Sequence, residues 1–465
     1  MAQPFPDNIY LTGAAAPSGI ECDAPDLVIE GELPADLEGV YFRNGPDPLY
    51  PPVEGQEYHW FHGDGMIQRF EFSGGRVSWK NRWVRTEKYE LERKAGRSLF
   101  GVLGNPFGAD PSVADEHYNT ANTHIVWHGG RLLALMEGTI AVEMQPDSLE
   151  TVGNFDFDGQ ISGPVTAHPK FDHATGEMIF FGNQAKGPFT DFMRYNVADR
   201  DGNLVRNEMI QVPYPAFVHD FMVTEKHVIF PIYPLAFNIE RAMAGVPLAW
   251  EPDRGTHFGV MPRDGGPEDI TWHSMDPRWS FHMMNAWEDD ENIYIDICAS
   301  NATEFAPMLD GNFANRDDTY PTLRRWTIDK QGGTDTVREE LLDDFRCEFP
   351  RTDDRYMTTA YQHGYAVGGV HGPLAFNRIA HYDVRSGDRK LWGEDKYLLG
   401  EPILAPRAAD SGENDGYLLD LAYNQETELN ELLVLDAADI TLGPVARVHL
   451  PVRIPSGFHG TWVGA

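Results

Sequence analysis

The chain has 465 residues and a formal charge of −35, because 72 acidic residues outnumber 37 basic ones. A chain this acidic repels phosphate backbones and anionic lipid, which argues against nucleic-acid binding. Hydrophobic residues make up 42% of the chain, enough for a sizeable core. The three cysteines include no CxxC pair, which argues against a disulfide framework and favours a reducing compartment.

The first residues, from Met1 to Pro6, have neither the basic start nor the apolar stretch of a secretory signal. The chain also contains no run of about 18 apolar residues, the length that a membrane-spanning helix needs. We therefore expect a cytoplasmic protein without a transmembrane segment.

Short apolar runs end in turn-forming residues and then resume, which is typical of β-hairpins. Such patterns occupy residues 70–79, 141–152, 194–203, 325–333, 381–387 and 433–439. Equivalent points recur near every fifty residues: Met144 to Tyr195 is 51, Trp326 to Tyr382 is 56, and Tyr382 to Leu435 is 53. This recurrence favours propeller blades of four strands, of which about seven would fill the chain. A double-layer sandwich is the alternative.

Long helices are scarce in this pattern. Residues 85–99 and 236–249 are the better amphipathic candidates, and we expect them to form a cap over one face of the strands. No linker, low-complexity tract or charge block interrupts the chain. Because closed β architectures can exceed the usual domain length, we expect one all-β domain of residues 1–465.

Four histidines stand far apart in the chain: His168, His219, His282 and His459, separated by 51, 63 and 177 residues. Any one of them alone is more simply a surface or core histidine. Their surroundings change that interpretation, because ordered segments across the chain resemble the carotenoid cleavage oxygenase family. These segments are residues 41–46, 62–66, 121–123, 134–137, 281–288, 348–351, 400–402 and 457–460.

The resemblance implies a seven-bladed β-propeller with a small α-helical dome over the active site, and an Fe(II) ion held by the four histidines. It further implies that three glutamates orient the ligand histidines and that a threonine leans over the vacant position of the iron. The matching residues are Glu137, Glu348, Glu401 and Thr123. The chemistry agrees, because imidazole suits iron and a metal-bound histidine needs its second nitrogen held by a partner.

Within the family the chain looks most like the bacterial lignostilbene- and isoeugenol-cleaving branch, through residues 97–101, 167–172 and 250–255. Members that cleave hydroxystilbenes hold the phenol with a Tyr and a Lys, and here Leu103 and Met136 stand at those positions. We therefore expect an alkene whose deep end is apolar, such as an apocarotenoid or a non-phenolic stilbenoid. The candidate substrate contacts are Trp60, Phe61, Leu103, Met136 and Phe281, with core packing as their alternative role.

The function implied by the resemblance is that of an Fe(II) dioxygenase. It would cleave a C=C bond of a stilbenoid, phenylpropene or apocarotenoid into two carbonyl products. Its partners are dioxygen and the hydrophobic alkene; the chain has no GxGxxG or Walker loop for a nucleotide cosubstrate. The alternatives are an apocarotenoid-specific enzyme without stilbene activity, a non-catalytic iron-binding propeller, isomerohydrolase chemistry and a calcium-dependent hydrolase. We expect a monomer or a homodimer.

Overall fold

The computed structural model of the protein describes residues 4–333, 337–369 and 376–465. Within these ranges the regular structure is almost entirely β-strand, with two α-helices, which confirms the all-β prediction. The chain forms two compact units. Unit 1 comprises the described residues of Met1–Ser162, Gly372–Asn377 and Trp392–Ala465, and unit 2 those of Gly163–His371 and Arg378–Leu391. The single domain of residues 1–465 stays a prediction.

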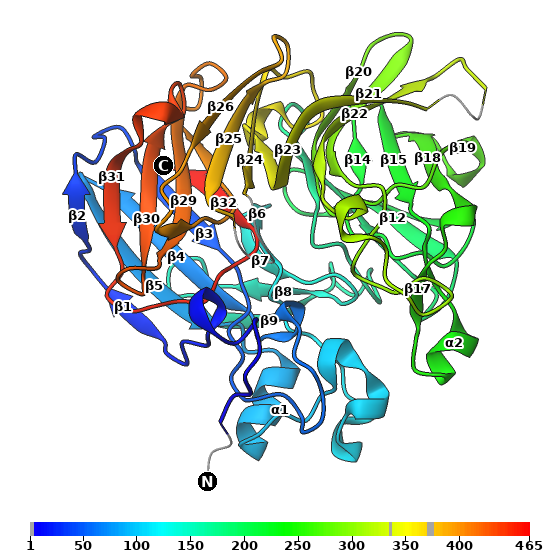
Figure 1. Ribbon diagram of the computed structural model, residues 1–465, viewed down its shortest axis with the longest axis horizontal. Coiled ribbons are helices and arrows are strands. Elements are labelled where there is room, and N and C mark those ends of the chain that lie inside the picture. Colours follow the sequence, from blue (N-terminus) through cyan, green and yellow to red (C-terminus); the bar gives the residue numbers. More distant parts are fainter. Residues whose placement is uncertain (1–3, 334–336, 370–375) are drawn as a thin grey trace. The chain divides into compact units, whose positions relative to one another are not determined.

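Unit 1 contains three antiparallel sheets (Figure 1). The first has the order β1-β5-β4-β3-β32, with β1 (Cys22–Ala24), β3 (Gly39–Arg43), β4 (Met66–Ser73), β5 (Arg76–Trp83) and β32 (Gly460–Gly464). The second has the order β6-β7-β8-β9, with β6 (His124–His128), β7 (Arg131–Leu135), β8 (Ala141–Met144) and β9 (Thr151–Phe155). The third contains β2 (Val28–Gly31), β27 (Tyr397–Leu398), β28 (Ile403–Pro406), β29 (Gly416–Asn424), β30 (Leu429–Asp436) and β31 (Pro444–His449).

Two sheets of unit 1 combine strands from opposite ends of the chain. Strand β32 pairs with β3, so that Arg43 lies opposite Gly460, and β31 pairs with β2. Residues near the C-terminus are thereby held by strands near the N-terminus. This pairing fixes the segment that carries His459, directly before β32.

Unit 2 contains two four-stranded sheets, a hairpin and a seven-stranded sheet. The four-stranded sheets are β10 (Lys170–Asp172), β11 (Glu177–Gly182), β12 (Phe192–Ala198) and β13 (Leu204–Gln211), and β14 (Met222–Val223), β15 (His227–Ile232), β18 (Thr256–Pro262) and β19 (Thr271–Met275). The hairpin is β16 (Leu235–Phe237) with β17 (Leu248–Trp250). The seven-stranded sheet runs in chain order through β20 (Met283–Glu288), β21 (Asn292–Ala299), β22 (Thr322–Asp329), β23 (Arg338–Thr352), β24 (His363–Gly368), β25 (Arg378–Asp383) and β26 (Asp388–Trp392).

The long strand β23 joins two four-stranded groups within the seven-stranded sheet. Its first half pairs with β22 and its second half pairs with β24. Counted in this way, the described residues contain three blade-sized sheets in unit 1 and four in unit 2. This number is consistent with the seven blades that were predicted.

The predicted hairpins are present where the sequence placed turn residues. Strands β4 and β5 pair from Met66↔Trp83 to Ser73↔Arg76 and leave a two-residue turn. Its residues, Gly74 and Gly75, have φ values of 58° and 73°, the left-handed conformation that a type I′ turn requires at both positions. The side chains on the buried face of this hairpin, such as Phe70 and Trp79, are at most 1% exposed.

One of the two predicted helices is confirmed and the other is mostly wrong. Helix α1 (Glu87–Ala95) starts at the N-cap Thr86, whose side chain accepts from Tyr89 N–H, and ends at Gly96 with φ 70°. In residues 236–249, only α2 (Ile239–Met243) is helical. The flanking residues pair as the β16–β17 hairpin, because their backbone bonds across to each other and Pro247 cannot continue a helix.

Short 3-10 helices make up the remaining helical residues. They are η1 (Gly13–Ala15), η2 (Trp60–His62), η3 (Val102–Gly104), η4 (Pro106–Gly108), η5 (Pro111–Val113), η6 (Pro252–Arg254), η7 (Pro267–Asp269), η8 (Arg316–Asp318), η9 (Asp354–Tyr356) and η10 (Ile440–Leu442). Figure 1 shows α1 on the side of unit 1 away from strands β29–β31. The helical component is thus small, as predicted; its place over the active site stays a prediction.

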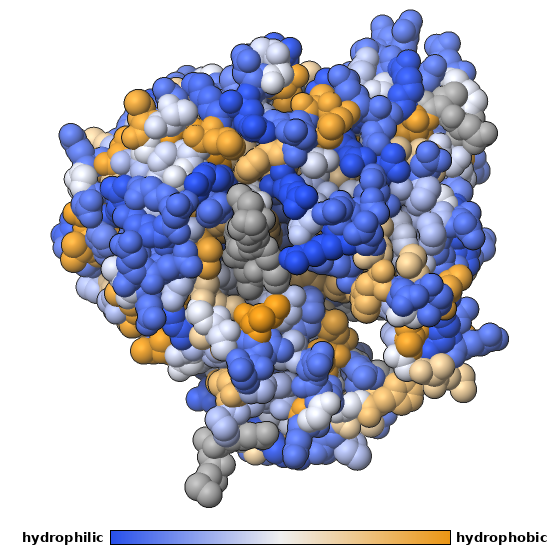
Figure 2. All heavy atoms as spheres, in the orientation of Figure 1, coloured by the Kyte–Doolittle hydropathy of each residue, from blue (hydrophilic) through white to orange (hydrophobic). Residues whose placement is uncertain are grey.

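The surface in view in Figure 2 is mainly hydrophilic, which agrees with the charge of −35. Among the described residues, no helix has both the length and the apolar character needed to cross a bilayer.

Candidate metal centre

Three of the predicted ligand histidines lie at the same kind of position in the sheets of unit 2. His168 precedes β10, His219 precedes β14 and His282 directly precedes β20. Each of these strands is an edge strand of its sheet. All three side chains are buried, with exposed fractions of 5–8%. Equivalent positions in three sheets therefore explain why ligands so far apart in sequence can meet.

The ring nitrogens of these histidines converge. Nε2 of His219 lies 2.9 Å from Nε2 of His168 and 3.1 Å from Nε2 of His282, and the candidate ligand atoms all lie within 4.8 Å of one another. Two imidazole nitrogens bound at about 2.1 Å to one ion lie about 3.0 Å apart at a right angle and about 3.4 Å apart at the tetrahedral angle. The observed separations bring these nitrogens close enough for one ion to bind them together.

A carboxylate sets the protonation of one of these rings. Nδ1 of His282 lies 2.6 Å from Oε2 of Glu348, which also accepts from Phe349 N–H at 2.5 Å. Because an ionised carboxylate only accepts hydrogen bonds, the His282 proton resides on Nδ1 and Nε2 presents a lone pair. Glu348 sits at a register irregularity of β23, and Phe349 has a left-handed φ of 50°. The bulge aims the carboxylate at the histidine.

An ion pair that the sequence reasoning missed connects all three ligand segments. Lys170 Nζ lies 2.6 Å from Oδ1 of Asp220, and Oδ2 of Asp220 accepts from Met283 N–H at 3.2 Å. These residues stand within two positions of His168, His219 and His282, respectively, and both charged side chains are at most 10% exposed. The signal in the sequence was a charged residue within two positions of each of two predicted ligands, His168 and His219.

The fourth predicted ligand, His459, lies in unit 1 and has the same kind of partner. Its Nδ1 lies 2.8 Å from Oε1 of Glu401, and Oε2 of Glu401 accepts from Gly460 N–H at 2.9 Å. Both side chains are at most 4% exposed. The carboxylate therefore keeps the His459 proton on Nδ1, as Glu348 does for His282. This repeated histidine–glutamate pair is the arrangement expected of metal ligands.

Thr123 is placed beside His459 by backbone hydrogen bonds. Its carbonyl oxygen accepts from His459 N–H at 3.2 Å, and its hydroxyl donates to Oδ1 of Asn122 at 3.0 Å. The buried Asn44 strengthens this junction, because its amide donates to the carbonyl oxygens of Ala121 and His124, at 2.8 and 2.9 Å. Asn44 N–H also donates to the His459 carbonyl oxygen at 2.9 Å.

Aromatic rings surround the histidines of unit 2. Phe281, a predicted substrate contact, meets the His219 ring edge-on at a centroid distance of 5.1 Å. Phe217, Phe305 and Phe349 were not predicted. Phe217 lies parallel to His219 at 6.3 Å, Phe305 contacts both Phe217 and Phe281, and Phe349 stacks on His282 at 5.2 Å. The sequence could have indicated Phe217 and Phe349, because each stands within two positions of a predicted ligand or carboxylate.

Two further predicted contacts lie next to His459 in unit 1. The rings of Trp60 and Phe61 pack on Phe458, at 4.3 and 5.6 Å, and Trp60 Nε1–H donates to the Ser456 carbonyl oxygen at 3.2 Å. Asn122 holds the Phe61 carbonyl oxygen at 2.9 Å. The residues before His459 are thus packed between aromatic rings.

Leu103, Met136 and Glu137 are also in unit 1. Leu103 is 46% exposed and has a left-handed φ of 53°, and its N–H donates to Nδ1 of His62 at 3.2 Å. Burial lowers the pKa of His62 well below its usual value, so the ring is neutral and can accept this bond. Met136 and Glu137 follow β7 directly and are half-buried. The role of Glu137 as a partner of a ligand histidine stays a prediction.

The antiparallel sheets and the buried histidines define a β-sheet protein with a site suited to a metal ion. The chain belongs to the retinal pigment epithelial membrane protein (RPE65) family, which matches residues 15–464. Isoeugenol monooxygenase of Pseudomonas putida is 39% identical over 469 residues, covering 97% of each chain. The crystal structure of Pseudomonas brassicacearum lignostilbene dioxygenase has a TM-score of 0.96 at 39% identity and covers 100% of both chains. A variant of the Synechocystis apocarotenoid oxygenase has a TM-score of 0.84 at 31% identity over 96% of each chain.

These relatives confirm the predicted family and the predicted class of enzyme. The chain is an oxygenase of the carotenoid- and stilbene-cleaving type. The likeness in structure also confirms the propeller fold.

Proposed function

We propose that the enzyme is an Fe(II)-dependent dioxygenase that cleaves a C=C bond of a conjugated, largely apolar alkene. The observation that carries the proposal is the convergence of three buried imidazole nitrogens at 2.9 and 3.1 Å, with a carboxylate behind one of them. We assign the ion to His168, His219 and His282, with His459 as the fourth ligand. The pairing of His459 with Glu401 supports the assignment of His459, because it repeats the pairing of His282 with Glu348.

Neutral imidazole ligands suit divalent iron. Bound Fe(II) supplies a centre that activates dioxygen for reaction with an alkene. The net reaction converts R–CH=CH–R′ and O₂ into RCHO and R′CHO. The C=C bond breaks, each carbon gains one oxygen atom, and the alkene supplies the electrons that reduce dioxygen. No reducing cosubstrate is needed, and a calcium-dependent hydrolase would require oxygen ligands instead.

The residues of the chain hold and shield this site. Glu348 and Glu401 keep the proton of His282 and of His459 on Nδ1, which leaves Nε2 free of a proton for a cation. Phe217, Phe281 and Phe305 present apolar surface beside His219, which excludes water and accepts the flat face of a conjugated substrate. Thr123, whose backbone bonds to His459, is proposed to restrict access to the vacant position of the iron.

The substrate belongs to the classes on which the relatives act by name: phenylpropenes, stilbenoids or apocarotenoids. Leu103 and Met136 can neither bind nor deprotonate a phenol, so we propose an alkene whose end near these two residues is apolar. Trp60, Phe61 and Phe281 are proposed to contact it. Apocarotenoid cleavage without stilbene activity is the second candidate, favoured by the same two apolar side chains. The cytoplasmic location and the monomeric or homodimeric state stay predictions.

The test is an aerobic assay of the Fe(II)-reconstituted enzyme with three substrates in parallel: a 4-hydroxystilbene, its 4-methoxy analogue and an apocarotenal. We expect aldehyde products from the methoxystilbene or the apocarotenal. Under ¹⁸O₂, a dioxygenase places label in both carbonyl products, whereas a monooxygenase labels one. His282→Ala is the inactive control. Cleavage of the hydroxystilbene with no turnover of the other two would refute the proposed substrate, and label in a single product would refute the dioxygenase assignment.

A further inference from the structure

We propose that Arg43 is a positioning residue that holds His459 and Glu401 in register with each other. Its guanidinium connects the two chain segments that carry this pair. The inference rests on the proposed role of His459 as a metal ligand, and all the residues concerned lie in unit 1.

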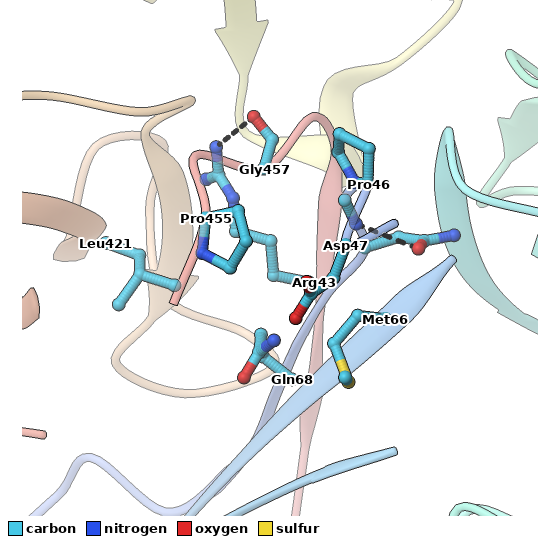
Figure 3. Close-up of a pocket in the computed structure, with 10 residues that line it drawn as sticks. Arg43, Pro46, Asp47, Met66, Gln68, Leu421, Pro455 and Gly457 are labelled. Carbon is cyan, nitrogen blue, oxygen red and sulfur yellow. Dashed lines mark hydrogen bonds between the residues drawn. The ribbon is translucent and has the colours of Figure 1, made fainter. Parts of the chain in front are cut away.

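Arg43 is the last residue of β3 and is 2% exposed. Its Nη2 donates to the Gly457 carbonyl oxygen at 3.3 Å, and its Nη1 donates to the Glu401 carbonyl oxygen at 3.2 Å. Figure 3 shows the guanidinium directed at the carbonyl oxygen of Gly457, at the edge of a small pocket. Nη1 also lies 3.2 Å from the Tyr41 hydroxyl oxygen, on the same face of the strand. The planar guanidinium of Arg43 therefore donates hydrogen bonds both to the backbone of Glu401 and to the backbone two residues before His459.

Two glycines show how closely this guanidinium is fitted. A Cβ atom at Gly400 would lie 2.6 Å from Nη2 of Arg43, and a Cβ atom at Gly457 would lie 2.8 Å from Nε. Both distances are shorter than real Cβ contacts allow. Gly400 directly precedes Glu401, and Gly457 stands two residues before His459. The guanidinium thus occupies the space where side chains of both segments would lie.

Arg43 also supplies the positive charge in a region with two buried carboxylates. Glu401 is 1% exposed and Asp420 is fully buried, and Oδ1 of Asp420 accepts from Gly400 N–H at 3.0 Å. Both carboxylates interact electrostatically with Arg43. Burying acidic side chains without a compensating charge is costly, so the guanidinium offsets part of that cost in this region.

A lysine cannot reproduce this arrangement. Its single ammonium lacks the rigid fork that bonds two carbonyl oxygens, and its flexible stem does not fill the flat space between the glycines. Arg43→Lys therefore keeps the charge and removes the geometry. A buried arginine in the neighbouring strand offers a matched control. Arg69 of β4 is 6% exposed and pairs in register with Phe42, and its Nε–H donates to the Pro146 carbonyl oxygen at 3.0 Å.

The experiment compares Arg43→Lys with Arg69→Lys in two measurements on the full chain. The first is Fe(II) affinity under anaerobic conditions by competition with a coloured chelator. The second is backbone amide exchange of residues 457–461 in the metal-free protein. We expect Arg43→Lys to weaken Fe(II) binding by about 10–100-fold and to speed exchange at Gly460 by a similar factor. Arg69→Lys should leave both within about 2-fold of wild type, whatever it does to the unfolding temperature.

Three results separate the possibilities. If Arg43→Lys matches Arg69→Lys in both measurements, the positioning role is overturned. If His459→Ala binds Fe(II) as tightly as wild type, the proposed ligand set fails and the inference falls with it. If His459→Ala binds weakly while Arg43→Lys binds like wild type, only the positioning role fails. Should Arg43→Lys not fold, Gly400→Ala replaces it, because the added Cβ displaces the guanidinium while leaving the charge; wild-type affinity in that variant would overturn the proposal.

Discussion

Replacing Glu348 by Gln is the sharpest single test of the carboxylate behind His282. Oε2 of Glu348 accepts both from His282 Nδ1–H at 2.6 Å and from Phe349 N–H at 2.5 Å. A glutamine can present its one carbonyl oxygen to both donors, so the shape of the site survives. Its amide nitrogen must then take the place of Oε1, which is buried and has no hydrogen-bond partner among the described residues. The change therefore removes a charge and adds an unsatisfied donor.

The lost charge and the unsatisfied donor together set the size of the effect on metal binding. Hydrogen bonds to an ionised acceptor are roughly twice as strong as neutral ones, and the neutral amide holds the Nδ1 proton of His282 less firmly. Removing an outer partner of a metal-bound histidine typically weakens metal binding about 10–100-fold, which corresponds to about 1.4–2.7 kcal/mol. We expect Glu348→Gln to fall in this range.

The assay is anaerobic Fe(II) binding by chelator competition, with Glu339→Gln as the control. Glu339 lies in the same strand, its side chain is 19% exposed against 13% for Glu348, and it forms an ion pair with Arg278 at 2.7 Å. Both variants lose one carboxylate charge from β23, but only Glu348 contacts a proposed ligand. Wild-type Fe(II) affinity in Glu348→Gln, or an equal loss in Glu339→Gln, would refute the reasoning.

Two further predictions concern substrate choice and pH. The double variant Leu103→Tyr with Met136→Lys should gain hydroxystilbene cleavage, because a phenol then has a donor and a cation; no gain over either single variant would argue against both positions contacting the substrate. Burial raises the pKa of Asp420 to about 7, well above the value of about 3.9 in an unfolded chain. The folded state thus binds this proton more tightly, and the stability it contributes is lost as the pH rises from about 4 to 7. The unfolding temperature of Asp420→Asn, minus that of wild type, should therefore increase from pH 5 to pH 8. A difference that stays constant over this range would contradict the raised pKa of Asp420.

Local sequence patterns predicted the secondary-structure elements that depend on interactions between residues close together in the chain. The β4–β5 hairpin follows from apolar alternation and from two glycines that accept left-handed φ values, and α1 follows from its amphipathic pattern and its caps. The same reasoning was wrong for residues 236–249. There the pairing of Leu235–Phe237 with Leu248–Trp250 outweighs a helical pattern. Strand pairing of this kind depends on contacts that no short window of sequence contains.

The candidate site likewise has a part that the sequence predicted and a part that it did not. Imidazoles and carboxylates are the groups that bind and orient a metal of this kind, and the segments that resemble the family identified which of these residues were the candidates. The sequence by itself therefore determined the fold class, the family and the candidate ligands. Only the tertiary structure decided that His168, His219 and His282 meet through Nε2 and that Lys170 and Asp220 join their segments. It alone decided that Arg43 joins Gly457 to Glu401. These contacts link residues 50 to 414 positions apart, and their distances depend on how the sheets fold rather than on local preference.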